Sequence, residues 1–202
     1  MTDAGEPIRA VTFDFWRTIY QDPPEVHRER VRLRVRYAVD FLRAREANVT
    51  DSGVELALEL LSRHVQDLSA HHNTGVSAEE LGRTLARTVN APLDLADAER
   101  LGELISWAGR EEPPRPLPRA VEAVSSVAEA LPVGLICDTG LTLGRDLYAV
   151  LEADGLAGLF AHFTFSDQTG TTKPMTRQFH HTLLRLGVRP VEAAHVGDTE
   201  GK

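Results

Sequence analysis

The sequence predicts an α/β fold, a Rossmann-like parallel sheet core flanked by helices and interrupted by an inserted all-helical cap. The first observation is that short apolar runs at residues 8–15, 133–137 and 193–196 stop at carboxylates, small polar residues or a Gly-Asp pair. Such runs are typical of buried parallel strands, whose carboxyl ends hold ligands. We expect residues 170–174 to be a fourth strand ending in a polar cluster. The second observation is that strand and helix patterns alternate after residue 118, as they do in parallel sheets.

After the first strand, residues 8–15, the first helix is predicted to begin at residues 22–25. Asp22 is expected to cap it, Pro23 suits the first helical turn, and Glu25 stands where the acid of a capping box belongs. Residues 28–36 alternate in polarity and alone would pass for a strand. The capping signal and the longer run of apolar residues at helical spacing decide for a helix.

Three further helices are predicted at residues 54–68, 77–89 and 96–108, the second of them opened by a capping box. A proline-rich stretch, residues 111–118, then reads as a return from an inserted unit. We therefore expect two units: a discontinuous α/β core of residues 1–21 and 112–202, and a helical cap of residues 22–111.

The remaining elements alternate between helix and strand along the second half of the chain. The predicted order is helix 118–130, strand 133–137, helix 144–153, strand 163–165, helix 176–186 and strand 193–196. This repeat predicts a parallel sheet with helices on both faces. The sequence stops directly after the last strand, where a helix and often another strand normally follow. We expect the C-terminal end of the core to be missing from it.

Composition excludes several classes of protein. The 202 residues carry a net charge of -8 with a pI near 5.5, which argues against a general nucleic-acid binder. Cys137 is the only cysteine, so an intrachain disulfide is impossible. The N-terminus lacks the pattern of a signal peptide, and no apolar run approaches the ~20 residues of a membrane helix. We expect a cytoplasmic protein without membrane or nucleic-acid partners; the sequence does not predict its oligomeric state.

The polar residues at the predicted strand ends form one chemically coherent set. They offer a nucleophilic carboxylate at Asp14, a cation at Lys173 and a second carboxylate at Asp198. Such a set suits covalent transfer of an anionic group, for example phosphoryl. Lys173 is informative because the chain has one other lysine, Lys202, and uses arginine for nearly every other basic position.

Four motifs in order resemble those of the haloacid dehalogenase-like (HAD) hydrolase superfamily, in its branch with a helical cap. The motifs are Asp14-Phe15-Trp16-Arg17-Thr18, Cys137-Asp138-Thr139, Lys173-Pro174 and Gly197-Asp198. The resemblance covers residues 8–20 and 115–202. It implies a magnesium-dependent hydrolase that acts on a small phosphorylated, anionic metabolite.

The resemblance also implies a role for each matching residue. Asp14 corresponds to the nucleophile that forms an aspartyl-phosphate, and Lys173 to the cation that neutralises the transferred group. Asp14, the backbone carbonyl of Trp16 and Asp198 correspond to the ligands of Mg²⁺. The residues expected to bind the substrate or its phosphoryl group are Thr18, Cys137, Asp138 and Thr139.

Three positions depart from the family pattern. Trp16 stands where the family has a second aspartate, the general acid, and Cys137 stands where it has a hydroxyl. Four residues after Asp198 the sequence has Lys202 rather than an acid, and the spacing of Glu200 is wrong for that role. These departures weaken the expected general-acid step and the expected magnesium site.

Two other functions remain open. A carbon–halogen hydrolase of the haloacid dehalogenase type is favoured by Trp16, since that branch has an aromatic residue there, whereas Gly197-Asp198 favours the metal-dependent branch. A catalytically impaired binding protein on the same scaffold is the third class. The histidine pairs at residues 71–72 and 180–181 match no metal-binding spacing. Substrate identity cannot be predicted, because no cap residue forms a recognisable code.

Overall fold

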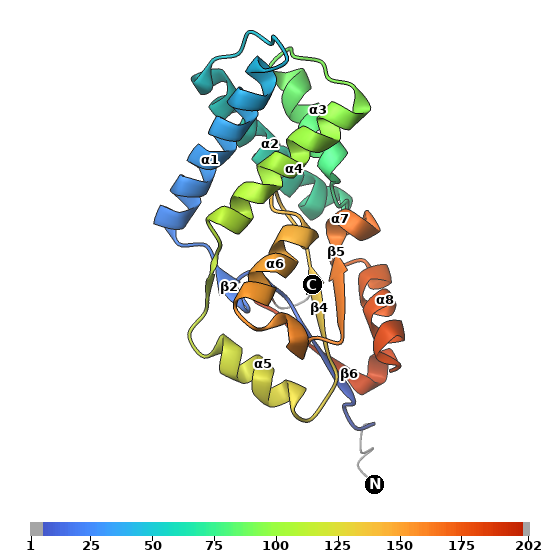
Figure 1. Ribbon diagram of the computed structural model, residues 1–202. Helices are drawn as coiled ribbons and strands as arrows, with labels where there is room; N and C mark the ends of the chain where they lie inside the picture. Colours follow the sequence, from blue (N-terminus) through green and yellow to red (C-terminus); the bar gives the residue numbers. More distant parts are fainter. Residues whose placement is uncertain (1–5, 200–202) are drawn as a thin grey trace.

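The structure, a computed structural model, describes residues 6–199; Glu200 and Lys202 lie outside them. Its core is a parallel sheet in the order β5 (His162–Phe165), β4 (Val133–Cys137), β1 (Ala10–Phe13) and β6 (Ala193–Val196) (Figure 1). The predicted α/β fold is confirmed. The first strand is shorter than predicted, because only its four fully buried residues pair with neighbouring strands.

The side chains of β4 point alternately to the two faces of the sheet and show which helix covers each face. Leu135 and Cys137 face one hydrophobic cluster together with Leu147 and Leu151 of α6 (Gly144–Ala153). Gly134 faces the opposite side, where a Cβ atom would come within 2.7 Å of a methyl group of Thr182 in α8 (Thr176–Leu186). Successive side chains of a strand point to opposite faces, so helices cover both sides of the sheet, as predicted.

The other core helices follow the predicted order. α5 (Ala120–Ala128) lies on the same side as α6, and α8 (Thr176–Leu186) lies on the other (Figure 1). A short helix that the sequence pattern did not predict, α7 (Ser166–Thr169), follows β5 directly. Two 3₁₀ turns, Ala157–Leu159 and Pro190–Glu192, precede β5 and β6.

Four helices form the layer above the sheet: α1 (Pro24–Arg43), α2 (Asp51–His72), α3 (Ala78–Thr88) and α4 (Leu95–Glu111) (Figure 1). Their buried residues form a second hydrophobic cluster, apart from that of the sheet. The capping box predicted at Ser77 and Glu80 is present. Within residues 22–110 the described structure has no strand longer than the single bridge between Thr74 and Thr171.

The predicted cap of α1 is wrong. The N-cap residue is Pro23, with Pro24 in the first turn, and no side chain caps the helix. The carboxylate of Asp22 instead accepts a hydrogen bond from Arg30 at 3.0 Å and lies 3.1 Å from the ring of His27. Arg30 is buried, and a buried guanidinium needs an anionic partner more than a helix end needs a cap.

A two-stranded ribbon joins the sheet layer to the cap helices. β2 (Tyr20–Gln21) pairs antiparallel with β3 (Arg115–Pro116), with Tyr20 opposite Pro116 and Gln21 opposite Arg115. The proline-rich segment thus includes a short strand as it returns from the cap. Among the described residues no helix is long and apolar enough to cross a membrane.

Candidate active site

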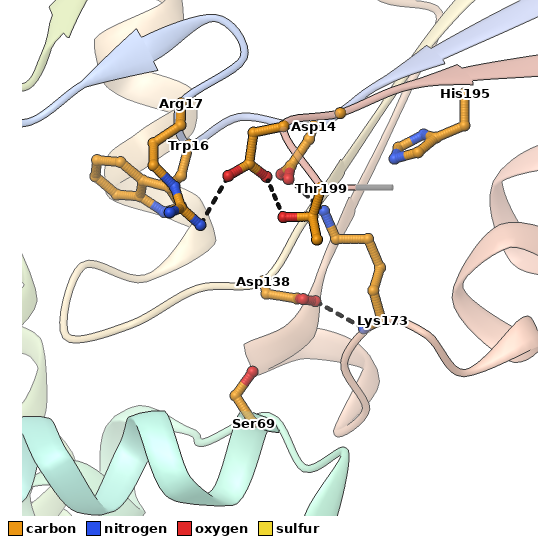
Figure 2. Close-up of a pocket in the computed structure, with 10 residues that line it drawn as sticks. Asp14, Trp16, Arg17, Ser69, Asp138, Lys173, His195 and Thr199 are labelled. Carbon is orange, nitrogen blue, oxygen red and sulfur yellow. Dashed lines mark hydrogen bonds and ion pairs between the residues drawn. The ribbon is translucent and has the colours of Figure 1, made fainter. Parts of the chain in front are cut away.

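A cavity of about 190 Å³ opens at the carboxyl edge of the sheet, beside the end of α2 (Figure 2). It brings together five of the predicted site residues: Asp14, Trp16, Asp138, Lys173 and Asp198. It is also lined by four residues with functional groups that had no predicted role: Arg17, Ser69, His195 and Thr199. Segments from the start, middle and end of the chain therefore meet at one site.

Asp14 and Lys173 form an ion pair in this cavity. Asp14 follows β1, and its Oδ2 lies 2.7 Å from Nζ of Lys173, while its Oδ1 accepts a hydrogen bond from the N–H of Phe15 at 2.7 Å. The ammonium also donates to the carbonyl of Ile136 at 3.3 Å, and the Lys173 side chain is only 6% exposed. Both carboxylate oxygens are thus oriented, beside a cation that can offset charge developing on a transferred group.

Lys173 does not follow a strand, contrary to the prediction for residues 170–174. The segment is a loop between α7 and α8, held at several points by neighbouring groups. The N–H of Lys173 donates to Oδ1 of Asp138 at 2.9 Å (Figure 2), and the amide of Gln178 donates to the carbonyl of Thr171. Apart from the single bridge between Thr171 and Thr74, hydrogen bonds to side chains hold this segment, and Asp138 positions the lysine loop.

The cap layer contributes to the same site through α2. Ser69 points toward the cavity from the last turns of this helix (Figure 2). The N–H of Thr172 donates to the carbonyl of Asn73 at 3.1 Å, and the N–H of Gly75 donates to the carbonyl of Gly170 at 3.2 Å. The end of α2 is therefore fastened to the loop that carries Lys173.

Three predicted binding residues do not line the cavity. Cys137 is 0% exposed. Burial raises the pKa of its thiol well above the ordinary value, and the negative charge of the nearby Asp14 raises it further. Thr139 is engaged by Ser166, whose hydroxyl accepts its N–H at 2.8 Å. The hydroxyl of Thr18 is buried and has no hydrogen-bond partner among the residues described. Cys137 points away because its strand position places it in the layer between sheet and α6.

Asp198 is paired with Arg17 across the cavity mouth. One guanidinium nitrogen lies 2.7 Å from Oδ2 of Asp198, and the hydroxyl of Thr199 donates to Oδ1 at 3.2 Å (Figure 2). Arg17 has a φ of 59°, in the left-handed region that favours glycine, and its N–H donates to the carbonyl of Tyr20 at 2.6 Å. Nothing in the local sequence pattern distinguishes Arg17 from a surface arginine.

The chemistry of the cavity fits Mg²⁺ in part. Asp14 and Asp198 supply carboxylate oxygens, the hard ligands that this ion prefers, on one small cavity. A backbone carbonyl at Trp16 and water molecules would complete such a set. Among residues 6–199, however, no group of three or more His, Cys, Asp or Glu side chains is suited to hold a metal.

His195 adds an imidazole ring to the cavity wall. It lies on β6, with Nδ1 2.9 Å from the hydroxyl of Thr12 and its ring perpendicular to that of Phe179, at 5.1 Å between centroids. Burial lowers the pKa of His195, and the positive charge of Lys173 lowers it further. Its position on an edge strand of ordinary composition gave no signal in the sequence.

Comparisons with known proteins agree with this architecture. A family model described as haloacid dehalogenase-like hydrolase matches residues 8–201. No curated protein matches the sequence significantly. Among solved structures, a 2-haloacid dehalogenase from Pseudomonas syringae is similar at 22% identity with a TM-score of 0.62, over 95% of this chain and 78% of that one.

Two further solved structures belong to other members of the same fold. A HAD phosphatase from Thermococcus onnurineus is 18% identical with a TM-score of 0.59, over 95% of this chain and 78% of that one. YfnB from Bacillus subtilis, in a structure bound to magnesium, is 16% identical with a TM-score of 0.57, over 96% and 79%. At such identities the likeness establishes the fold alone.

Proposed function

This chain belongs to the haloacid dehalogenase-like hydrolase family, and we propose that it hydrolyses a small phosphorylated metabolite through an aspartyl-phosphate on Asp14. The observation that supports this most is the pair of Asp14 and Lys173, 2.7 Å apart on a cavity that also holds Asp138 and Asp198. A carboxylate held against a buried ammonium, at the carboxyl edge of a parallel sheet, is placed to attack an anionic group.

In the first proposed step, a carboxylate oxygen of Asp14 attacks phosphorus. The new bond is an acyl phosphate, and the bond between phosphorus and the leaving oxygen breaks with its electron pair on that oxygen. Lys173 offsets the negative charge shared by the nucleophile and the phosphoryl oxygens. Asp138 contributes by holding the backbone of Lys173 in place.

In the second proposed step, water attacks the phosphorus of the aspartyl-phosphate. Inorganic phosphate is released, the Asp14 carboxylate is restored, and the water proton passes to solvent. Mg²⁺, bound by Asp14, Asp198 and the Trp16 carbonyl, would supply further positive charge beside the phosphoryl oxygens. Thr18, Cys137 and Thr139 would support the wall of the site rather than contact substrate.

Substrates with good leaving groups are the expected class. Trp16 lines the cavity at the position where this family has its general acid, and an indole cannot donate a proton to a leaving alkoxide. An acyl or aryl phosphate departs with little protonation, whereas a sugar phosphate needs a proton in the transition state. The small cavity, about 190 Å³, also favours a compact substrate.

A second candidate is hydrolysis of a 2-haloacid, favoured by the same Trp16. Asp14 would then attack the carbon that bears the halogen, form an ester and expel halide. Water would next attack the carbonyl carbon of that ester; the bond from this carbon to the substrate oxygen breaks, the 2-hydroxy acid leaves, and the Asp14 carboxylate is restored. Arg17 and Lys173 supply the positive charge that a substrate carboxylate requires without a metal.

The position of heavy oxygen after one turnover in labelled water distinguishes the two reactions. Phosphatase chemistry puts the label into phosphate, because water attacks phosphorus, whereas dehalogenase chemistry puts it into the Asp14 carboxylate. The two substrates to be tested are an aryl phosphate, with and without Mg²⁺, and a 2-haloacid. Asp14→Asn should abolish either activity, while Asp40→Asn on the exposed side of α1 should not change it. Turnover of neither substrate would favour a binding protein.

A further inference from the structure

We propose that Arg17 and a divalent cation compete for Asp198, so that Arg17 lowers the affinity of this site for metal. This inference rests on the proposed function only in taking Asp198 as a metal ligand. The guanidinium lies 2.7 Å from Oδ2, and the Thr199 hydroxyl occupies Oδ1 at 3.2 Å. A metal that coordinates Oδ2 competes with the guanidinium, because two cations beside one carboxylate oxygen repel each other.

Arg17 is able to leave. Its side chain is 75% exposed, whereas that of Asp198 is 19% exposed. An exposed ion pair with a long, flexible side chain contributes little free energy and is screened by salt. The carboxylate is the fixed partner, therefore, and the guanidinium is the one that moves.

The guanidinium comes from a backbone position with a positive φ. Arg17 adopts a left-handed conformation, and its N–H donates to the carbonyl of Tyr20 in a tight turn. A residue with a side chain pays a conformational cost in this region, whereas glycine does not. A cation is thus held over Asp198 at a position whose backbone suits a residue without a side chain.

Two cations already pair with the two carboxylates that are taken as metal ligands. Lys173 pairs with Asp14 and Arg17 with Asp198, each at 2.7 Å. Positive charge at the cavity therefore exists before any metal binds. We infer that metal binding adds less to this site than it would to two unpaired carboxylates.

The test measures metal binding directly, with Mn²⁺ as a probe for Mg²⁺ and the EPR signal of free Mn²⁺ as readout. Arg17→Gly and Arg17→Asn remove the cation and both tolerate the left-handed backbone. Each should tighten Mn²⁺ binding by about three- to tenfold. Arg17→Lys keeps a cation and should stay within about twofold of the wild type.

Matched controls separate charge from backbone effects. Arg119 also has a positive φ, of 66°, but lies at the start of α5 and does not line the cavity. Arg119→Gly should leave Mn²⁺ affinity unchanged, and Asp198→Asn in the Arg17→Gly background should weaken it. Unchanged or weaker binding in both Arg17→Gly and Arg17→Asn, including no saturable binding, would overturn the inference. The heavy-oxygen assay at Asp14 tests the proposed function independently of this result.

Discussion

The hydroxyl of Thr172 donates a hydrogen bond to the backbone carbonyl of Ser69 at 3.1 Å, between the residue before Lys173 and helix α2. Thr172 is completely buried, and its N–H is also bound to the end of α2. The position of Lys173 is therefore coupled to the position of the cap helices. Any displacement of α2 relative to the sheet must either break these bonds or move the lysine loop.

Gly75→Ala should disturb this junction. A Cβ atom at Gly75 would overlap the backbone carbonyl of Ser166, which cannot move aside as a side-chain tip would. We expect a loss of about 1–3 kcal/mol in the free energy of unfolding and a lower kcat. Urea denaturation and steady-state kinetics check both. Gly158→Ala is the control, because open space surrounds that Cβ position; equal losses in the two variants would contradict the explanation.

Lys173→Met should remove most of the activity. The substitution keeps the length of the side chain but leaves the Asp14 carboxylate without its buried cation. Loss of a charge aimed at the transition state costs about 10²–10³ in kcat. Lys173→Arg keeps the charge in a bulkier, planar form and should retain part of the rate. Single-turnover kinetics measure this, and equal rates for the Met and Arg variants would argue against an electrostatic role.

Tyr20→Phe should destabilise the fold without changing the cavity, which Tyr20 does not line. Tyr20 is completely buried, stacks on Phe15 with ring centroids 4.5 Å apart, and donates its hydroxyl to Asp154 at 2.7 Å. Loss of that hydrogen bond costs about 1–2 kcal/mol. Tyr148→Phe is the matched control, since the Tyr148 hydroxyl is not hydrogen-bonded within the described part of the chain. Urea midpoints compare the two variants, and the idea fails if they shift equally.

Stability should fall on mild acidification because of His195. Its pKa is lowered in the folded protein, first by burial and then by Lys173, from an ordinary value of 6.5. At a pH above 6.5, His195 is neutral in both the folded and the unfolded protein. Below it the unfolded chain takes up a proton that the folded protein resists, so stability is lost as pH falls from about 6.5 toward the folded pKa.

His195→Gln should therefore flatten the dependence of unfolding free energy on pH between about 7.5 and 5.5. Glutamine keeps a polar side chain opposite the Thr12 hydroxyl and does not titrate. His64→Gln, on the exposed face of α2, serves as the control and should leave the slope unchanged. Urea denaturation at several pH values gives the slopes, and identical slopes for wild type and His195→Gln would refute the assignment.

Trp16→Asp should change the preference among substrates. A carboxylic acid at this position restores a proton donor, which is worth about 10²–10⁴ in rate when the leaving group needs a proton. Activity on alkyl phosphates should therefore rise more than activity on aryl phosphates. Trp16→Phe keeps an aromatic ring without the acid and should leave the ratio of activity on alkyl phosphates to activity on aryl phosphates unchanged. Equal changes on both substrates would count against a missing general acid.

The sequence predicted the regular elements well where one local signal dominated. β4 and β6, α6 and α8 begin and end at the expected residues, because each is a short apolar or periodic run between clear breaks. The prediction failed at Asp22, where a buried arginine far along the helix competes for the carboxylate. It also missed the ribbon, since strands of two residues carry no periodicity.

The residues of the candidate site also differ in whether a local sequence signal predicts them. Asp14, Asp138 and Asp198 could be placed together because each comes just after a strand, and parallel strands end at one edge. The contact between Arg17 and Asp198 joins residues from opposite ends of the chain and has no local signature. The inward direction of Cys137 depends on which face of β4 its position occupies, and a strand buried on both faces shows no alternation from which to read it.

The ribbon of β2 and β3 has a consequence for engineering. Gln21 leaves the sheet layer directly opposite Arg115, where the chain re-enters it, so the two junctions of the intervening helical segment are neighbours. For the rest of the chain, that segment is equivalent to the loop of a hairpin, whose closure entropy rises only slowly with length. Exchange for another helical module, or for a tight turn, would keep the ribbon but would remove the hydrogen bonds between the end of α2 and the loop that carries Lys173. The ribbon is nonetheless the natural splice point for chimeras that retain the sheet and replace what covers it.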